Sequence, residues 1–230
     1  MKIDQVSDSV YVVAGTNVNW ALISSGSGVT LIDAGYPGDT ADVLKSVREV
    51  GHRLEDLSAV LITHAHLDHI GAIPALVESV GMPVYTGGAE VPHARRDYLE
   101  QITPKDMIRQ LSTARGRRWV AQTLRAVRGG MATTIPSAAS VDDVVLPGGL
   151  TPIPTPGHTT GHTAYLLSAE GVLFSGDALV TGHPLSRRSG PQVLPAVFNH
   201  DEAQTLASAR LLANQTARTI VPGHGPAIHQ

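Results

Sequence analysis

The chain has 230 residues, of which 42% are hydrophobic and 16% are charged, and it contains no cysteine. These proportions predict a single folded α/β domain over residues 1–230 and exclude a disordered chain, disulfide bonds and thiolate metal sites. The net charge of −3 excludes a general electrostatic attraction to nucleic acid. No apolar signal core or long apolar run is present, so we expect a cytoplasmic protein with no membrane partner.

The first 33 residues contain short apolar runs separated by turn residues, which is typical of an antiparallel meander. We expect strands at Val10–Ala14, Trp20–Ile23 and Val29–Ile32, with turns at Gly15–Asn17 and Ser24–Gly28. These turns contain the glycine, serine and asparagine residues that reverse the chain direction.

Two segments then show the apolar spacing of amphipathic helices, Asp39–Val50 and Ile70–Val80, and a glycine follows each. Apolar runs at Ala59–Ile62 and Val84–Tyr85 predict strands. The alternation of strands and helices predicts a sheet with helices packed against one face.

The composition changes between Ala89 and Met131, because nine of the 17 Lys and Arg residues lie between Arg95 and Arg128. We interpret residues 89–135 as a basic helical insertion, which either only packs its apolar residues against the domain or forms a cap over the functional site. Its apolar residues are spaced to share one side of a helix and could also serve a homo-oligomer. Its arginines are either solvated or form a cationic face for an anionic substrate or a partner.

Strand patterns resume in the second half of the chain, where glycine and proline pairs separate the apolar runs. The order of strands, then a helix, then a strand resembles that of the first half. The predicted elements are strands at Val141–Leu146, Leu150–Pro154, Ala164–Leu167 and Val172–Phe174, a helix at Asp201–Ala213, and a strand at Thr219–Val221.

The segment Thr63–His69 follows a predicted buried strand and contains four strong metal ligands, His64, His66, Asp68 and His69. Imidazole and carboxylate groups are the ligands that zinc takes when no thiolate is available. A cluster at the end of a strand can direct His64 and His66 to one side and Asp68 and His69 to another, which suits two metal ions. The alternative is a polar loop whose histidines face water.

Three later segments share one arrangement, in which an apolar run leads into a glycine-containing turn that carries a strong ligand. These segments are Thr155–His162, Phe174–Asp177 and Val221–Pro226. Glycine allows the backbone to turn sharply and to approach a metal ion closely. Together with the first cluster, the three segments predict one composite metal centre.

In this ordered set of motifs, from Asp33 to His224, the sequence resembles the metallo-β-lactamase-fold hydrolase superfamily. The resemblance implies a four-layer αββα sandwich with two zinc ions at one edge, between the two sheets; iron or manganese is the alternative metal. By this resemblance, the first metal would be bound by His64, His66 and His158, the second by Asp68, His69 and His224, and both by a bridging Asp177.

Two further residues match positions of the family that lie outside the ligand set. Asp33 matches an early aspartate that orients a metal-bound histidine, although an ordinary turn cap is the alternative. His162 matches a frequent histidine of the third motif that is usually not a ligand.

The resemblance implies a dinuclear hydrolase in which a metal-bridging hydroxide attacks the carbonyl carbon of an ester, thioester or lactone. Asp68 and Asp177 would be catalytic, because they tune the charge of the metal pair and orient the nucleophile. Zinc β-lactamases generally lack the bridging aspartate, which argues against antibiotic hydrolysis. Two alternatives stay open: a mononuclear iron persulfide dioxygenase of the same fold and a non-catalytic metal-binding protein.

Tyr36 and His183 are candidates for a general acid, because each follows an aspartate of the motif set; a surface-loop position is the alternative for both. We expect a small-molecule substrate that can carry negative charge, bound by arginines of the insertion and of the loop after Asp177. These arginines are Arg115, Arg117, Arg118, Arg187 and Arg188.

Overall fold

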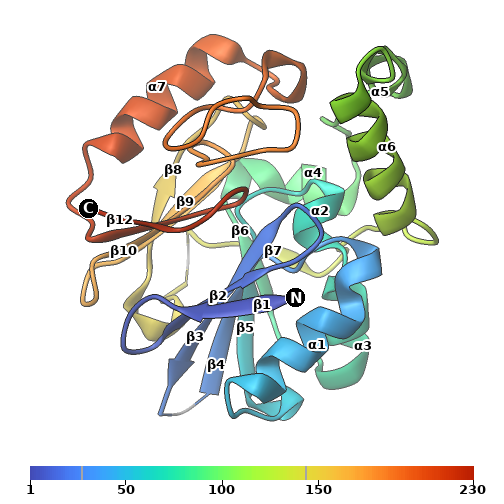
Figure 1. The fold of residues 1–230 in the computed structure, drawn as a ribbon. Helices are drawn as coiled ribbons and strands as arrows, with labels where there is room; N and C mark the ends of the chain where they lie inside the picture. The colour runs from blue at the N-terminus through green and yellow to red at the C-terminus, as the bar shows by residue number, and fades with distance from the viewer. Residues whose placement is uncertain (27, 143) are drawn as a thin grey trace.

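Two β-sheets stack face to face at the centre of the molecule (Figure 1). The computed structural model describes residues 1–26, 28–142 and 144–230. The first sheet has seven strands in the spatial order β1-β2-β3-β4-β5-β6-β7, and the second has five in the order β12-β11-β10-β9-β8. The strands are β1 (Lys2–Gln5), β2 (Val10–Ala14), β3 (Asn19–Ser25), β4 (Gly28–Ile32), β5 (Leu57–Leu61), β6 (Val84–Thr86), β7 (Ala138–Ser140), β8 (Thr151–Pro154), β9 (Thr163–Leu167), β10 (Val172–Gly176), β11 (Thr219–Pro222) and β12 (Ile228–His229).

Helices lie on the outer sides of the two sheets (Figure 1). The α-helices are α1 (Thr40–Glu49), α2 (Leu67–Ile70), α3 (Ile73–Val80), α4 (Val91–Arg95), α5 (Pro104–Gln110), α6 (Ala114–Ala126) and α7 (Glu202–Ala213). Short 3-10 helices occur at Pro37–Asp39, Leu54–Asp56, Gly88–Glu90, Pro147–Gly149 and Ala196–Phe198. None of the described helices is both long and apolar enough to cross a bilayer.

The alternation of side chains along each strand divides the core into layers, because successive residues point to opposite faces of a sheet. Trp20 and Leu22 of β3 pack in the cluster that contains α1 and α3, whereas Ala21 and Ile23 pack between the sheets. The first sheet is therefore buried on both faces.

The second sheet follows the same rule. Phe174 of β10 packs between the sheets, and its neighbour Leu173 packs with Leu212 of α7 on the outer face. The order of layers is helices, sheet, sheet, helix, which confirms the predicted αββα sandwich.

The strand pairs that lead to the predicted ligands end at one edge of the sandwich. β4 pairs in parallel with β5, and β10 pairs in parallel with β11. The last apolar residues of these strands, Ile32, Leu61, Phe174 and Val221, all belong to the cluster between the sheets. The motif residues that follow these strands therefore meet directly beyond a shared apolar base.

The strand expected at Val141–Leu146 is wrong. The strand in this region is β7, at Ala138–Ser140, which pairs in parallel with β6. Val145 is 99% exposed, so this apolar residue has no sheet face to pack against. Asp143 within the expected strand, and Ser27 within the expected turn at Ser24–Gly28, lie outside the described residues.

The sequence patterns also missed the two edge strands β1 and β12 and the start of the second helix. β1 is largely exposed and polar, and β12 has only two residues, so neither shows an apolar alternation. The helix expected at Ile70–Val80 begins only at Ile73, as α3, and the separate short helix α2 ends at Ile70. Between residues 89 and 135 lie α4, α5 and α6.

We expect Phe174→Ala to lower the free energy of unfolding by about 3–5 kcal/mol, because it removes a buried aromatic ring from the layer between the sheets. Denaturant unfolding in the presence of a chelator measures this change without a contribution from bound metal. Val145→Ala, at a side chain that is 99% exposed, is the control and should change the value by less than about 0.5 kcal/mol. Equal effects of the two substitutions would contradict the described layers.

Candidate metal centre

The seven predicted ligands come together at the edge where the strands end. Their ligand atoms form three overlapping groups, and within each group the atoms lie within 4.8 Å of one another. Asp68 is partly exposed, and the other six residues are buried. The groups are His64, His66 and His158; His64, His69 and Asp177; and Asp68, His69 and His224.

The first group has the spacing of metal ligands. His66 Nδ1 lies 3.0 Å from His64 Nε2 and 3.0 Å from His158 Nε2. Nitrogen ligands at 2.0–2.1 Å around a tetrahedral zinc ion are about 3.3–3.4 Å apart. The three nitrogens are therefore close to the separation that one shared cation requires.

Asp177 lies between this group and the two remaining histidines of the cluster, His69 and His224. Its Oδ2 atom is 3.4 Å from His158 Nε2, 3.8 Å from His64 Nε2 and 3.0 Å from His224 Nε2. Its Oδ1 atom is 3.6 Å from His69 Nε2. One carboxylate thus approaches imidazoles of both groups.

All five histidines of the cluster use their other ring nitrogen to donate a hydrogen bond outside it. A neutral imidazole carries one N–H, so these bonds leave the inward nitrogen with a free lone pair. The acceptors, in order, are Thr63 Oγ1 for His64, the Glu100 carbonyl for His66, Asp33 Oδ2 for His69, Asn199 Oδ1 for His158 and the Asn17 carbonyl for His224.

The pKa values of these histidines fall into two sets. Burial, followed by the neighbouring imidazoles, lowers the pKa of His64 and His66 well below the ordinary value, so both are neutral at pH 7. Burial also opposes protonation of His69, but Asp33, Asp177 and Asp68 outweigh it and raise its pKa. The carboxylates that favour a proton on His69 equally favour a cation at the same place.

Two atoms at the centre of the cluster have no hydrogen-bond partner among the described residues, His69 Nε2 and Asp177 Oδ1. Buried polar atoms are rarely left unpaired, because their desolvation is then uncompensated. A cation between these two atoms, which lie 3.6 Å apart, would pair both. The donor set of nitrogen and carboxylate oxygen fits zinc, iron or manganese.

Asp33 fixes the first ligand segment to the end of β4. Its backbone has a φ of 59°, a left-handed conformation that aspartate tolerates better than most residues. Its carboxylate accepts hydrogen bonds of 2.8 Å from Thr63 N, from Thr63 Oγ1 and from His69 Nδ1. Asp33 therefore orients His69 directly and His64 through Thr63.

His162 is buried beside the cluster but does not point a free nitrogen into it. Its Nε2 accepts a hydrogen bond of 3.0 Å from Asp177 N, and its Nδ1 lies 2.8 Å from Thr155 Oγ1. Burial lowers the pKa of His162 to about 3, which keeps Nε2 available as an acceptor. His162 thus holds the backbone of Asp177.

Glu90, which is not among the residues predicted from the sequence, joins two ligand segments. Its Oε1 accepts hydrogen bonds from Ala65 N at 2.8 Å and His93 Nδ1 at 2.7 Å, and its Oε2 accepts from Thr159 Oγ1 at 2.8 Å and Gly161 N at 3.1 Å. Glu90 is fully buried. It follows strand β6 and two glycines, the same strand-and-glycine pattern that identified the other site residues.

The cluster opens into a cavity of about 390 Å³. His66, Asp68, His158, Asp177 and His224 form one end of this cavity. Tyr36 and His183, the candidates for a general acid, also line it. The surface-loop alternative is wrong for Tyr36, whose side chain is only 6% exposed.

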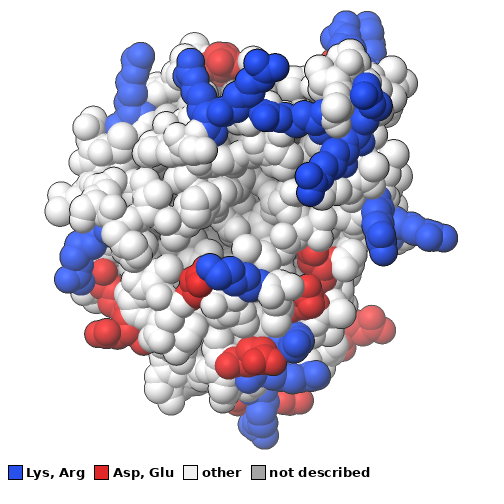
Figure 2. Space-filling model, viewed as in Figure 1, with Lys and Arg blue, Asp and Glu red and all other residues white. Residues whose placement is uncertain are grey.

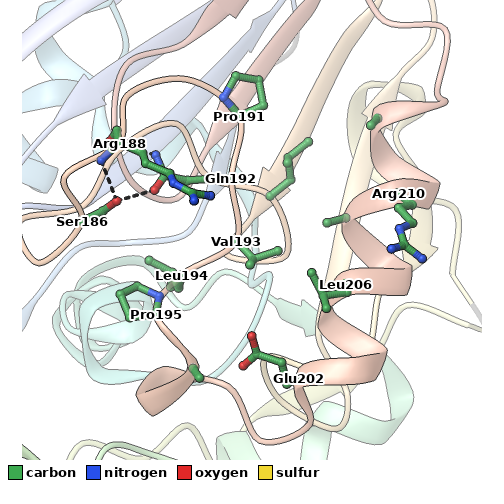
Figure 3. Close-up of a pocket in the computed structure, with 14 residues that line it drawn as sticks. Ser186, Arg188, Pro191, Gln192, Val193, Leu194, Pro195, Glu202, Leu206 and Arg210 are labelled. Atoms are coloured by element: carbon green, nitrogen blue, oxygen red, sulfur yellow. Dashed lines mark hydrogen bonds between the residues drawn. The ribbon is translucent and has the colours of Figure 1, made fainter.

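None of the five predicted substrate-binding arginines is among the described residues that line this cavity. All five are exposed. Arg115 donates a hydrogen bond to the Ser186 carbonyl, and Arg117 donates to that of Leu111. Arg188 borders a separate hollow of about 570 Å³ beside α7 (Figure 3). Basic side chains gather around the α5–α6 end of the molecule, while the hollow below them is uncharged (Figure 2).

We expect Gly223→Ala to lower metal affinity by about tenfold or more, because its Cβ would lie 2.1 Å from Asp177 Oδ1 and 2.9 Å from His69 Cε1. Metal analysis after dialysis against graded chelator measures the change. Gly26→Ala is the control, since its Cβ would meet no atom of the described residues within 4 Å. Unchanged affinity in Gly223→Ala would show that the carboxylate is not a ligand.

We expect Glu90→Gln to lower the free energy of unfolding by roughly 2–4 kcal/mol and also to weaken metal binding, because an amide cannot accept all four hydrogen bonds. Urea unfolding in chelator gives the first quantity and metal titration the second. Glu78→Gln, at an exposed position of α3, is the matched control. A loss of stability with unchanged metal affinity would show that Glu90 stabilises the fold but does not position the metal ligands.

Comparison with known proteins agrees with this architecture. The family model of the metallo-beta-lactamase superfamily matches residues 13–224. YobT, an uncharacterized protein of Bacillus subtilis (strain 168), is 31% identical over 218 residues, which cover 90% of this chain and 83% of YobT. Hydroxyacylglutathione hydrolase of Enterobacter sp. (strain 638) is 28% identical over 166 residues, or 72% of this chain and 48% of that enzyme.

Among solved structures, MEM-A1, a subclass B3 metallo-beta-lactamase from a soil metagenome library, aligns with a TM-score of 0.65 and 20% identity. The alignment covers 97% of this chain and 80% of MEM-A1, and at this identity it establishes the fold alone. The family match spans nearly all the elements that build the cluster. The chain therefore belongs to the metallo-beta-lactamase superfamily, whose members are generally hydrolytic metalloenzymes.

Proposed function

We propose that the protein is a dinuclear metal hydrolase that cleaves an ester, thioester or lactone. The observation that carries the proposal is the position of Asp177, whose two oxygens approach histidines of two separate groups within 3.0–3.8 Å. A carboxylate in this position suits two cations better than one. The similarity to hydroxyacylglutathione hydrolase supports hydrolysis at a carbonyl group.

In this proposal His64, His66 and His158 would hold the first ion. Asp68, His69 and His224 would hold the second, and Asp177 would be shared between them. Two divalent ions, zinc by preference, would supply a nucleophilic hydroxide near neutral pH and polarise the substrate carbonyl. Asp33, His162 and Glu90 keep the ligand segments in register through the hydrogen bonds described above.

Tyr36 and His183, the two candidates for the proton donor, both carry a proton at neutral pH. Burial, followed by the negative charge of Asp68, raises the pKa of Tyr36 well above its ordinary value, so its hydroxyl keeps its proton. Burial, followed by His224, lowers the pKa of His183 to about 3, so its ring is neutral at pH 7. Leu185 N donates to His183 Nδ1 at 3.1 Å, and the one ring proton therefore resides on Nε2.

We expect Asp177→Ala to retain the fold but to lose most of the bound metal and at least about 100-fold in kcat/KM on the substrate that wild type hydrolyses best. Asp97→Ala, at an exposed aspartate, is the control and should keep both properties. Circular dichroism checks the fold, and metal analysis runs in parallel with a panel of esters, thioesters and lactones.

Different outcomes of the same experiment identify the competing functions. One iron per chain with oxygen consumption that depends on a persulfide would replace the hydrolase with a dioxygenase. Two bound metal ions without turnover of any substrate in the panel would favour a non-catalytic metal-binding protein. Unchanged metal content in Asp177→Ala would contradict the shared ligand.

A further inference from the structure

The walls of the cavity over the cluster are mainly apolar and come largely from the insertion. The apolar side chains that line it include Trp119 and Val127 of the α6 region, Met107 of α5, Ile102 and Phe198. Trp119 packs edge-on against Phe198, with ring centroids 5.5 Å apart. The cavity thus adjoins the metal cluster and has a lining that suits a hydrocarbon chain.

Charged groups occur at only one end of this cavity. Asp68 and Asp177, both of the metal cluster, are the only Asp or Glu residues among the described lining residues, and no Lys or Arg is present there. An ionised group on a bound molecule would lose water along these walls without gaining a partner of opposite charge. The walls therefore disfavour a charged chain.

The mouth of the cavity exposes large apolar side chains. Leu99 is 62% exposed, Leu124 is 54% exposed and Met131 is 73% exposed, and all three line the same cavity. Exposed apolar groups gathered at one place are typical of a binding surface. Their continuity with a cavity that ends at the metal cluster indicates an occupant that reaches from the mouth to the metals.

We propose that the substrate carries an uncharged, apolar chain that fills this cavity and leaves along Leu99, Leu124 and Met131. The proposal rests on the proposed function for the reaction, but the chain itself is recognised by the cavity walls. The exposed arginines stay outside, where a polar or anionic part of the substrate remains in solvent. A volume of about 390 Å³ lies within the usual range of small-molecule sites.

The test uses the intrinsic fluorescence of Trp119, because binding can then be measured without turnover. The chain has two tryptophans, and the other, Trp20, is buried in the core away from the cavity, where its Nε1 donates to Ser46 Oγ. Titration with 1-butanol, 1-pentanol, 1-hexanol and 1-octanol should give dissociation constants that fall about three- to fourfold per added methylene. Trp119→Phe should abolish the signal.

Substitutions at the mouth test where the chain binds. Leu124→Asp and Met131→Asp place a charge at exposed positions of the cavity, and each should weaken 1-octanol binding about tenfold or more. Leu211→Asp is the matched control, because Leu211 is a 45% exposed leucine on α7 that does not line the cavity. The control should bind 1-octanol as wild type does.

Binding and hydrolysis are measured separately, so this inference and the proposed function can be contradicted independently of each other. Chain-length-dependent binding without any hydrolysis would leave the inference intact and contradict the proposed function. Hydrolysis without dependence of binding on chain length would overturn the inference. Sedimentation of wild type and Met131→Asp completes the test: self-association that this variant abolishes, without alkanol binding, would assign the apolar mouth to a second copy of the chain and also overturn the inference.

Discussion

The centre of this protein depends on the direction of five imidazole rings. In its neutral form each ring points a lone pair inward because its other nitrogen donates to a fixed acceptor, and lone pairs about 3 Å apart repel one another unless a cation or a proton lies between them. The acceptors come from the residues after β4 and β5, from the loop before β3, from the insertion and from the segment before α7. The cluster therefore exists only when both sheets and the insertion are in place.

The apolar residues directly beneath the cluster connect its geometry to the fold. Ile32, Leu61, Phe174 and Val221 are the last apolar residues of four strands of two sheets and share one packed layer, and the motif residues begin one to three positions later. Close packing leaves little freedom in the relative position of the strand ends. Few residues after each strand separate this layer from a ligand, so the layer sets where the ligand segments start.

Sequence alone identified most of the central strands and the motif residues that meet at their ends, because strand periodicity and glycine-containing turns are local signals. It missed the supports of the cluster for a physical reason. The carbonyl groups of Asn17 and Glu100 have no side-chain signature, and Glu90 acts through contacts with segments that are distant in the chain. The arginines illustrate the opposite case: their charge was evident, but the orientation of α6 and of the loop after Asp177 decides whether they line the cavity, and they do not.

Glu100 has a double attachment that affects how this scaffold can be redesigned. Its carbonyl accepts the hydrogen bond of His66, its carboxylate accepts two hydrogen bonds from Thr160 in the His158 loop, and the residues that follow it form the cavity wall. The insertion is consequently part of the site itself, because it supplies an acceptor for a ring of the cluster. A segment of a relative that replaces the insertion must supply its own acceptor for the His66 ring. Without that acceptor, a change of specificity would be accompanied by a less well oriented His66.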